Sequence, residues 1–284
     1  MEFLIASSTK ELCEILDEDP EREILAGGTD FMVEINYRHR DPKSIVAIDR
    51  VPELTRWRHD GDAVVIGACV TYREIERGPL ATLIPALAQS ARTVGSPQIR
   101  NAGTIGGNLA TASPAGDMIP VLLALDSTVT VRSLKGSRDL SIDNLITGVK
   151  EISLQPGEFI ESIRVPILNG PQEFLKVGPR NAMVISVVSL ALVTNPAEGK
   201  VAIALGSVNA VPSRASLAED HIRSYLNWES MTVNPSGLSI FRELIGGASN
   251  PIDDHRSSAN YRRHAIGILG ERALLRIFEG RSHE

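Results

Sequence analysis

Two glycine-rich segments of the sequence carry residues suited to binding a phosphate-containing ligand. The first is Leu25-Ala-Gly-Gly-Thr-Asp30, and the second runs from Gly95 to Asp117 with five glycines and several short hydroxyl and amide side chains. Glycine lets the main chain approach a ligand closely, and successive free N–H groups near a turn or a helix start form an anion-binding nest. Two such segments together favour an extended dinucleotide, because each can hold one half of it.

The second segment also has a plainer interpretation. It matches neither GxGxxG nor GxxxxGK[ST], so an ornate surface loop, with Asp117 as no more than a helix N-cap, is an alternative to a binding site. If the segment binds a nucleotide, its Thr104, Asn108 and Thr111 side chains supply polar groups at the close spacing that phosphate and ribose oxygens require.

The elements around these segments predict an α+β fold. The first 50 residues indicate a β-α-β-α-β unit, with strands at 3–6, 23–26 and 44–48, a helix after the Ser8-x-x-Glu11 capping box and a helix at 31–37. Further strands are expected at 63–67, 127–132 and 157–166, and helices at 71–75, 80–93 and 118–125. Residues 95–117 are too rich in glycine for an ordinary helix or strand.

A turn cluster at Asn169-Gly-Pro171 marks a candidate domain boundary. Beyond it, the pattern predicts an antiparallel sheet of three strands, at 173–177, 184–193 and 201–205, followed by helices at 217–225, 236–245 and 257–279. Inside the last helix, Gly267 and Gly270 each cost about 1 kcal/mol against alanine, which close packing against another element would explain. Arg262, Arg263 and His264 are expected on its solvated side, with a partner-contact patch as the alternative.

The composition excludes several classes of protein. Cys13 and Cys69 are the only two cysteines, which is too few for an iron–sulfur cluster or a structural zinc site held by this chain alone. A formal charge of −6 without basic blocks argues against nucleic acid as a partner. The longest nearly apolar stretch, 182–193, is shorter than the about 20 residues of a membrane span, and the start of the chain lacks a signal-peptide pattern, so we expect a cytoplasmic protein.

Three motifs together resemble the FAD-binding medium subunits of the molybdenum hydroxylases, the family of xanthine dehydrogenase and of the carbon monoxide dehydrogenase flavoprotein. They are Ala26-Gly-Gly-Thr-Asp30, Gly95-Ser-Pro-Gln-Ile-Arg-Asn101 and the long, specific Thr104-Ile-Gly-Gly-Asn-Leu-Ala-Thr-Ala-Ser-Pro-Ala-Gly-Asp117. The resemblance covers essentially the whole chain. It implies an FAD-binding domain of the vanillyl-alcohol oxidase (PCMH) type at 1–168, with subdomains at about 1–56 and 57–168, and a C-terminal flavoprotein domain at 171–284.

The resemblance also implies which residues touch FAD. Main-chain N–H groups of 26–30 and 104–108 would cradle the pyrophosphate, Thr111 and Asp117 would hold the ribityl and adenosine portions, Ile160 would pack on the flavin, and Lys176 would reach the edge of the isoalloxazine. An ordinary solvated strand lysine is the alternative for Lys176. The full predicted set is Leu25, Ala26, Gly27, Gly28, Thr29, Asp30, Gly95, Thr104, Ile105, Gly106, Gly107, Asn108, Thr111, Asp117, Ile160 and Lys176. Neither segment contains histidine, so the FAD is expected to be noncovalent, and neither a metal ligand nor a side-chain nucleophile or base is expected.

As implied by the resemblance, this chain passes electrons within a larger enzyme. A large subunit would carry molybdopterin, a small subunit two [2Fe–2S] clusters, and the complex would be a dimer of heterotrimers that reduces NAD, oxygen or another acceptor. Phe31, Met32 and residues 181–184 depart from the family pattern, which leaves the acceptor open. Two alternatives remain at this point: a self-contained flavin oxidoreductase of the same fold, and a nucleotide-binding scaffold without catalysis.

Overall fold

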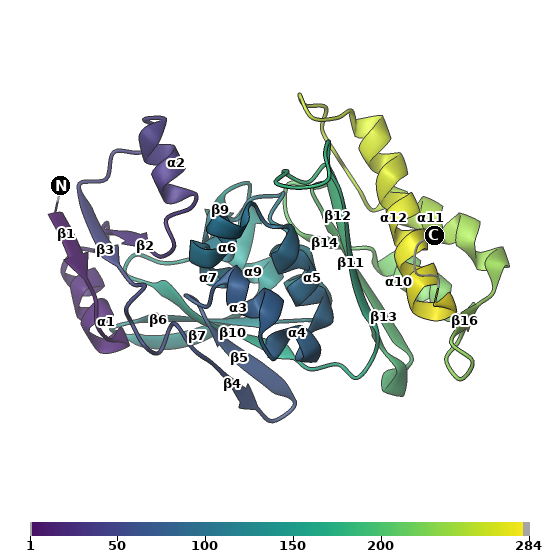
Figure 1. Cartoon of the computed structure of the whole chain (residues 1–284), viewed down its shortest axis with the longest axis horizontal. Helices are drawn as coiled ribbons and strands as arrows, with labels where there is room; N and C mark the ends of the chain where they lie inside the picture. The colour runs from purple at the N-terminus through teal and green to yellow at the C-terminus, as the bar shows by residue number, and fades with distance from the viewer. Residues whose placement is uncertain (1, 281–284) are drawn as a thin grey trace.

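The computed structural model describes residues 2–280 and shows three larger sheets that follow one another along the molecule, besides two small two-stranded ones (Figure 1). A small N-terminal sheet lies at one end, a five-stranded sheet with its helices lies in the middle, and a C-terminal sheet with three helices lies at the other end. Three groups of apolar side chains are buried, and two of them are shared between sheets: the middle core also takes Phe174 and Ala191 of the C-terminal sheet, and the N-terminal core takes Phe159 of the middle sheet. The fold is α+β, as predicted.

The first sheet is parallel and has the strand order β1-β3-β2. Its strands are β1 (Glu2–Ile5), β2 (Glu23–Leu25) and β3 (Ser44–Ala47), and its helices are α1 (Thr9–Glu18) and α2 (Phe31–Asn36). The predicted β-α-β-α-β unit is therefore confirmed. The capping box is only half formed, because Ser8 caps Glu11 whereas the carboxylate of Glu11 accepts from the N–H of Ser7.

The middle sheet is antiparallel and has the order β4-β5-β10-β6-β7. Helices lie over it in Figure 1, and their apolar faces share one core with the sheet. The strands are β4 (Trp57–Asp60), β5 (Ala63–Gly67), β6 (Thr128–Ser133), β7 (Gly136–Ser141) and β10 (Phe159–Pro166). The helices are α3 (Tyr72–Arg77), α4 (Leu80–Leu83), α5 (Pro85–Thr93), α6 (Pro97–Ala102), α7 (Ile105–Thr111), α8 (Met118–Ala124) and α9 (Ile142–Leu145), beside the hairpin of β8 (Ile146–Gly148) and β9 (Glu151–Ile152).

Two predictions for this part of the chain are wrong. The single helix at 80–93 is two helices, α4 and α5, because Pro85 cannot continue the first and instead starts the second. The stretch 95–117 contains two short helices, α6 and α7, in spite of its glycines. Each begins at a hydroxyl N-cap: Ser96 accepts from Ile99 at 3.3 Å, and Thr104 accepts from Gly107 at 3.0 Å.

The C-terminal sheet is antiparallel with the order β11-β12-β13-β14. It contains the three predicted strands, β11 (Gln172–Val177), β12 (Val188–Asn195) and β13 (Lys200–Gly206), and a two-residue fourth strand, β14 (Ser213–Arg214). The other elements are α10 (Ser216–Arg223), α11 (Leu238–Gly247), α12 (Ala259–Glu279), the pair β15 (Leu226–Asn227) and β16 (Thr232–Val233), and the 3-10 turns η1 (Pro196–Glu198) and η2 (Pro235–Gly237).

The predicted close packing of the last helix is present. A Cβ at Gly267 would lie 2.7 Å from the carbonyl oxygen of Arg242 on α11, so α12 and α11 approach at this point more closely than a side chain allows. No helix within residues 2–280 has the length and apolar character needed to cross a membrane. The division into domains 1–168 and 171–284 stays a prediction.

Candidate functional site

A cleft of about 1240 Å³ lies where the three parts of the molecule meet. It exceeds the roughly 300–1,000 Å³ usual for small-ligand pockets, which suits a dinucleotide. The predicted residues that line it are Ala26, Gly27, Gly28, Thr29, Asp30, Gly95, Thr104, Gly106, Gly107, Asn108, Thr111, Asp117, Ile160 and Lys176. Leu25 and Ile105 are not among the lining residues; Leu25 belongs to β2, and Ile105 is fully buried in the core beneath α7.

Residues 26–30 leave β2 and lead into α2 along one wall of the cleft. Gly28 has a φ of +70°, in the left-handed region, and a Cβ on Gly27 would lie 1.8 Å from the carbonyl oxygen of Ala102. Within residues 2–280, the N–H groups of Gly27, Gly28, Thr29 and Asp30 have no hydrogen-bond acceptor. A row of free N–H groups around a left-handed residue is the arrangement that binds a phosphate.

The second segment differs from the predicted cradle. The N–H groups of Ile105 and Gly106 donate to the carbonyl oxygens of Val70 (3.1 Å) and Ala68 (2.9 Å), and those of Gly107 and Asn108 donate to Thr104. These groups are already satisfied within the chain because they fasten α7 to the sheet and close its first turn. What α7 offers to the cleft is the side chain of Asn108, whose Oδ1 has no partner in the described part of the chain, together with Thr111 and the bare surface of Gly107.

Asp117 and Lys176 form a buried ion pair at the opposite side of the cleft. Lys176 Nζ on β11 lies 2.5 Å from Asp117 Oδ2, and the two side chains are 7% and 4% exposed. Lys176 Nζ also donates to the carbonyl oxygen of Thr93, whose hydroxyl donates to Asp117 at 2.8 Å. Burial raises the pKa of the Asp117 carboxyl above its ordinary value, while Lys176 and Thr93 act in the opposite direction.

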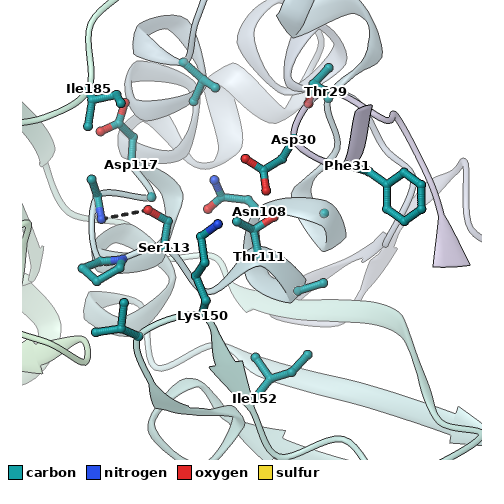
Figure 2. Close-up of a pocket in the computed structure, with 18 of the residues that line it drawn as sticks. Thr29, Asp30, Phe31, Asn108, Thr111, Ser113, Asp117, Lys150, Ile152 and Ile185 are labelled. Carbon is teal, nitrogen blue, oxygen red and sulfur yellow. Dashed lines mark hydrogen bonds between the residues drawn. The ribbon is translucent and has the colours of Figure 1, made fainter. Parts of the chain in front are cut away.

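Both plainer interpretations of this pair are wrong. Lys176 is not a solvated strand lysine, and Asp117 makes no capping hydrogen bond to α8, which begins directly after it. The other carboxylate oxygen of Asp117, Oδ1, is buried and has no partner among residues 2–280. It is therefore an acceptor without a donor, at a position where a ligand N–H could supply one. Figure 2 shows Asp117 beside Ile185 on one side of the cleft, with Thr29 and Asp30 across it.

The floor between these two polar regions is apolar. Ile160 on β10 is 5% exposed and lines the cleft together with Phe159, Ile152 and Leu154. Tyr72 also lines it, and burial raises the pKa of its hydroxyl, which keeps it protonated. An aromatic ring system can lie on such a floor with its polar edge at Asp117.

Several charged residues of the cleft are absent from the predicted set. Lys150 on the β8–β9 turn pairs with Glu34 of α2, and no motif surrounds either residue. Arg262 was expected on the solvated side of α12, but it is buried; its guanidinium donates to the carbonyl oxygens of Val187 and Ser207 and to Asp254. Arg263 and His264 are exposed, as expected.

Arg262 connects three segments that line the C-terminal side of the cleft. Burial opposes the ionisation of Asp254, but the N–H groups of Arg256 and Ser257 and the guanidinium of Arg262 lower its pKa to about 2. The carboxylate therefore stays charged at neutral pH and holds Arg262 in place.

Comparison with known proteins identifies the family. Residues 1–168 match the model of the FAD binding domain in molybdopterin dehydrogenase. The chain belongs to this family. It is 29% identical to the glyceraldehyde dehydrogenase medium chain of Sulfolobus acidocaldarius, with 97% of each chain covered, and 30% identical to the nicotine 6-hydroxylase medium subunit of Paenarthrobacter nicotinovorans, covering 95% of this chain and 94% of that subunit.

A solved structure gives the same result. A chain of carbon monoxide dehydrogenase from Hydrogenophaga pseudoflava superposes with a TM-score of 0.87 at 25% identity, over 100% of this chain and 98% of that one. The protein is thus an FAD-binding medium subunit of the molybdenum hydroxylase family, a family of oxidoreductases, and the predicted family, fold class and cofactor are confirmed.

The cleft of this chain fits FAD on its own geometry. Free N–H groups at 27–30 suit the diphosphate, the apolar floor at Ile160 suits the isoalloxazine ring, and the unpartnered Oδ1 of Asp117 suits a flavin N–H. Asn108 Oδ1 is a further acceptor without a partner. The individual contacts, for all sixteen predicted residues, stay predictions.

Proposed function

We propose that this chain binds FAD noncovalently and transfers electrons between its partner subunits and an external acceptor. The electrons come from [2Fe–2S] clusters on a small subunit, after substrate oxidation at a molybdopterin centre on a large subunit. They leave to NAD, oxygen or another acceptor. Bound FAD supplies the redox chemistry, because a flavin can receive electrons one at a time and release them in pairs.

The observation that carries the proposal is the pairing of two kinds of polar site across one cleft. The free N–H groups of 27–30 lie on one side and the buried Asp117–Lys176 pair on the other, with the apolar floor between them. A single phosphate or a small metabolite needs only one of these sites. An extended dinucleotide with a planar aromatic end uses both.

The chain's own residues then bind and orient the cofactor. Residues 27–30 hold the diphosphate through main-chain N–H groups, and Asp117 accepts a hydrogen bond from the flavin through Oδ1. Lys176 fixes the orientation of Asp117, and as a cation beside the pyrimidine edge it favours negative charge there. We also propose domains at 1–168 and 171–284, supported by the region that the family model matches.

Absorbance of the purified full-length chain tests the cofactor. We expect the two visible bands of an oxidised flavin, with one FAD released per chain on denaturation and none left attached to the protein. A colourless protein that does not take up added FAD contradicts the proposal. Flavin that stays with the denatured polypeptide contradicts noncovalent binding.

Purification from the native host tests the partnership. We expect the chain to co-purify with a molybdopterin-containing subunit and a [2Fe–2S] subunit as a dimer of heterotrimers, and to show no hydroxylase activity when alone. Recovery as a lone, catalytically active flavoprotein would instead support a self-contained oxidoreductase. With the complex in hand, reduction of NAD or of oxygen identifies the acceptor.

A further inference from the structure

An ion pair joins the two walls of the cleft at the end where the free N–H groups lie. Lys150 Nζ, on the turn between β8 and β9, is 2.6 Å from Glu34 Oε1 on α2, and the two residues are 116 positions apart in sequence. Both residues line the cleft. The Lys150 side chain is 55% exposed, and that of Glu34 is 22% exposed, so the pair lies at the cleft surface rather than in the core.

The backbone holds Lys150 in this place by a strained turn. Its φ is +59°, in the left-handed region that a lysine rarely adopts, and its N–H donates to the carbonyl oxygen of Ala112 at 3.1 Å, at the end of α7. Such conformations persist where the surrounding structure imposes them, and they concentrate at functional sites. In Figure 2 the ammonium group extends from the turn into the cleft towards Asn108 and Asp30.

The acidic side chains at this end of the cleft oppose a diphosphate, so the cations beside them matter for binding. Arg22 is one of these cations: its Nη2 pairs with Glu2 at 2.7 Å and with Asp19 at 3.6 Å, while its Nε and Nη1 are buried without a partner among residues 2–280. Asp30 and Glu34 both face the region where the N–H groups are free. Arg40 is held by two carboxylates, Glu23 at 2.9 Å and Glu34 at 3.5 Å, and its guanidinium lies 4.8 Å from the centre of the Phe31 ring. If Lys150 leaves, Arg40 therefore still neutralises Glu34.

We propose that Lys150 binds the diphosphate of the dinucleotide and that, in the absence of ligand, the Lys150 ammonium pairs with the Glu34 carboxylate instead. On binding, the ammonium exchanges the Glu34 carboxylate for diphosphate oxygens, while Arg40 retains Glu34. This inference rests on the proposed function, since it assigns a further contact to the same FAD site. The exchange costs little, because an ion pair at this level of exposure contributes little on its own. The diphosphate carries two negative charges, one on each phosphate, and so attracts the ammonium more strongly than a single carboxylate does.

The test is a titration of the flavin-free chain with FAD, in which the quenching of flavin fluorescence measures binding. Lys150→Met should weaken FAD binding about tenfold or more, the usual scale for loss of a charge-assisted contact, and Lys150→Arg should keep most of the affinity. Glu34→Gln should strengthen binding, by about two- to fivefold, because the competing carboxylate is gone. Lys200→Met is the matched control, since Lys200 pairs with Glu198 at 2.5 Å outside the cleft and should leave binding unchanged.

Opposite effects of Lys150→Met and Glu34→Gln on FAD affinity distinguish a contact to phosphate from an ion pair that only holds the two walls of the cleft together. If the ion pair only held the cleft together, Glu34→Gln would weaken FAD binding as Lys150→Met does, and that result overturns the proposal. Lys150→Met should also make the affinity for FAD less dependent on salt concentration. It should leave the affinity for riboflavin unchanged, because riboflavin has no phosphate.

The outcomes also separate this inference from the proposed function. A wild-type chain that binds FAD, with a Lys150→Met variant that binds it equally well, overturns only the role of Lys150. A wild-type chain that does not bind FAD overturns both. Thermal unfolding of each variant without flavin, close to that of the wild type, shows that a change in affinity is not a folding defect.

Discussion

Buried polar atoms in the cleft fall into two groups, those satisfied by the chain and those that are not. Thr104 and the N–H groups of 105–108 belong to the first group, because they build α7 and attach it to the sheet. The second group includes Asp117 Oδ1, Asn108 Oδ1 and the Nε and Nη1 atoms of Arg22. The N–H groups of 27–30 are also free, but they belong to residues that are half-buried or exposed. Since an unsatisfied buried polar group is costly, the second group indicates where a ligand completes the structure.

Gly107 provides the sharpest single-residue test of the site. Its ideal Cβ would lie 3.0 Å from Thr104 Oγ1 and would otherwise meet nothing within 4 Å, so a side chain there extends into the cleft. Gly107→Val should therefore reduce FAD affinity at least about tenfold, because the branched side chain occupies ligand space and crowds the cap of α7. The ratio of flavin to protein absorbance after gel filtration measures this.

The control for Gly107→Val is the same change in another helix. Gly247 on α11 lies outside the cleft and has no atom within 4 Å of its ideal Cβ, so Gly247→Val should retain FAD as the wild type does. Normal flavin content in Gly107→Val would show that α7 does not contact the cofactor. Equal loss in both variants would indicate a general folding defect instead.

At the scale of elements, the contact between α11 and α12 supports the C-terminal wall of the cleft. Arg262 on α12 donates to the carbonyl oxygens of Val187 and Ser207. Val187 directly follows the cleft-lining segment 184–186, and Ser207 begins the cleft-lining segment 207–210. The position of α12 is set by its close approach to α11 at Gly267. A change at this contact is therefore expected to affect stability first and the cleft second.

Gly267→Ala tests this contact. Alanine gains about 1 kcal/mol of helix propensity over glycine, but its Cβ would lie 2.7 Å from the carbonyl oxygen of Arg242, and overpacking of this kind costs about 1–3 kcal/mol. We expect a lower free energy of unfolding in urea for Gly267→Ala and an unchanged or higher one for Gly247→Ala, which meets no neighbour. Stabilisation by both substitutions would refute close packing at Gly267.

Element prediction from the sequence succeeded where one face is apolar and failed where local chemistry decides. The strands β5, β10, β12 and β13 bury apolar side chains and were found, whereas β4 and β7 are the edge strands of the middle sheet and read as polar segments. The glycines of α7 give it a low helix propensity, so the sequence predicts no helix there. The N-cap at Thr104 and the hydrogen bonds from the first turn of α7 to residues 68 and 70 outweigh that low propensity. The apolar spacing continues across Pro85, so the sequence pattern predicts one helix where Pro85 in fact starts a second.

The same distinction holds for the site. The glycine pair and the hydroxyls of the long motif identify the cleft walls, because their spacing in sequence is local. The pairings Asp117–Lys176 and Lys150–Glu34 join residues 59 and 116 positions apart, and only the tertiary fold brings them together. The resemblance to the family pointed to Lys176 and Asp117 as contacts, but their mutual ion pair and the whole of the Lys150 contact lie beyond sequence spacing.

At the scale of the whole molecule, the cleft depends on all three parts of the chain. The first sheet contributes 26–30, the middle part contributes α7 and Ile160, and the C-terminal sheet contributes Lys176 and the segments held by Arg262. A ligand that touches every part binds only when all are in place. Cofactor binding and the folding of the complete chain are therefore thermodynamically linked.

Thermal unfolding in the presence of FAD tests this linkage. At a free FAD concentration of about 100 times Kd, binding adds about 2.7 kcal/mol to the free energy of unfolding, which for a chain of this size raises Tm by about 4–5 °C. Calorimetry of the flavin-free chain with increasing FAD should show this rise as one shared shift of the N-terminal and C-terminal parts. Riboflavin at equal concentration should raise Tm less, because it lacks the diphosphate that we propose residues 27–30 bind. A transition for residues 171–284 that stays fixed while the rest of the chain is stabilised would show that Lys176 and its sheet do not take part in binding.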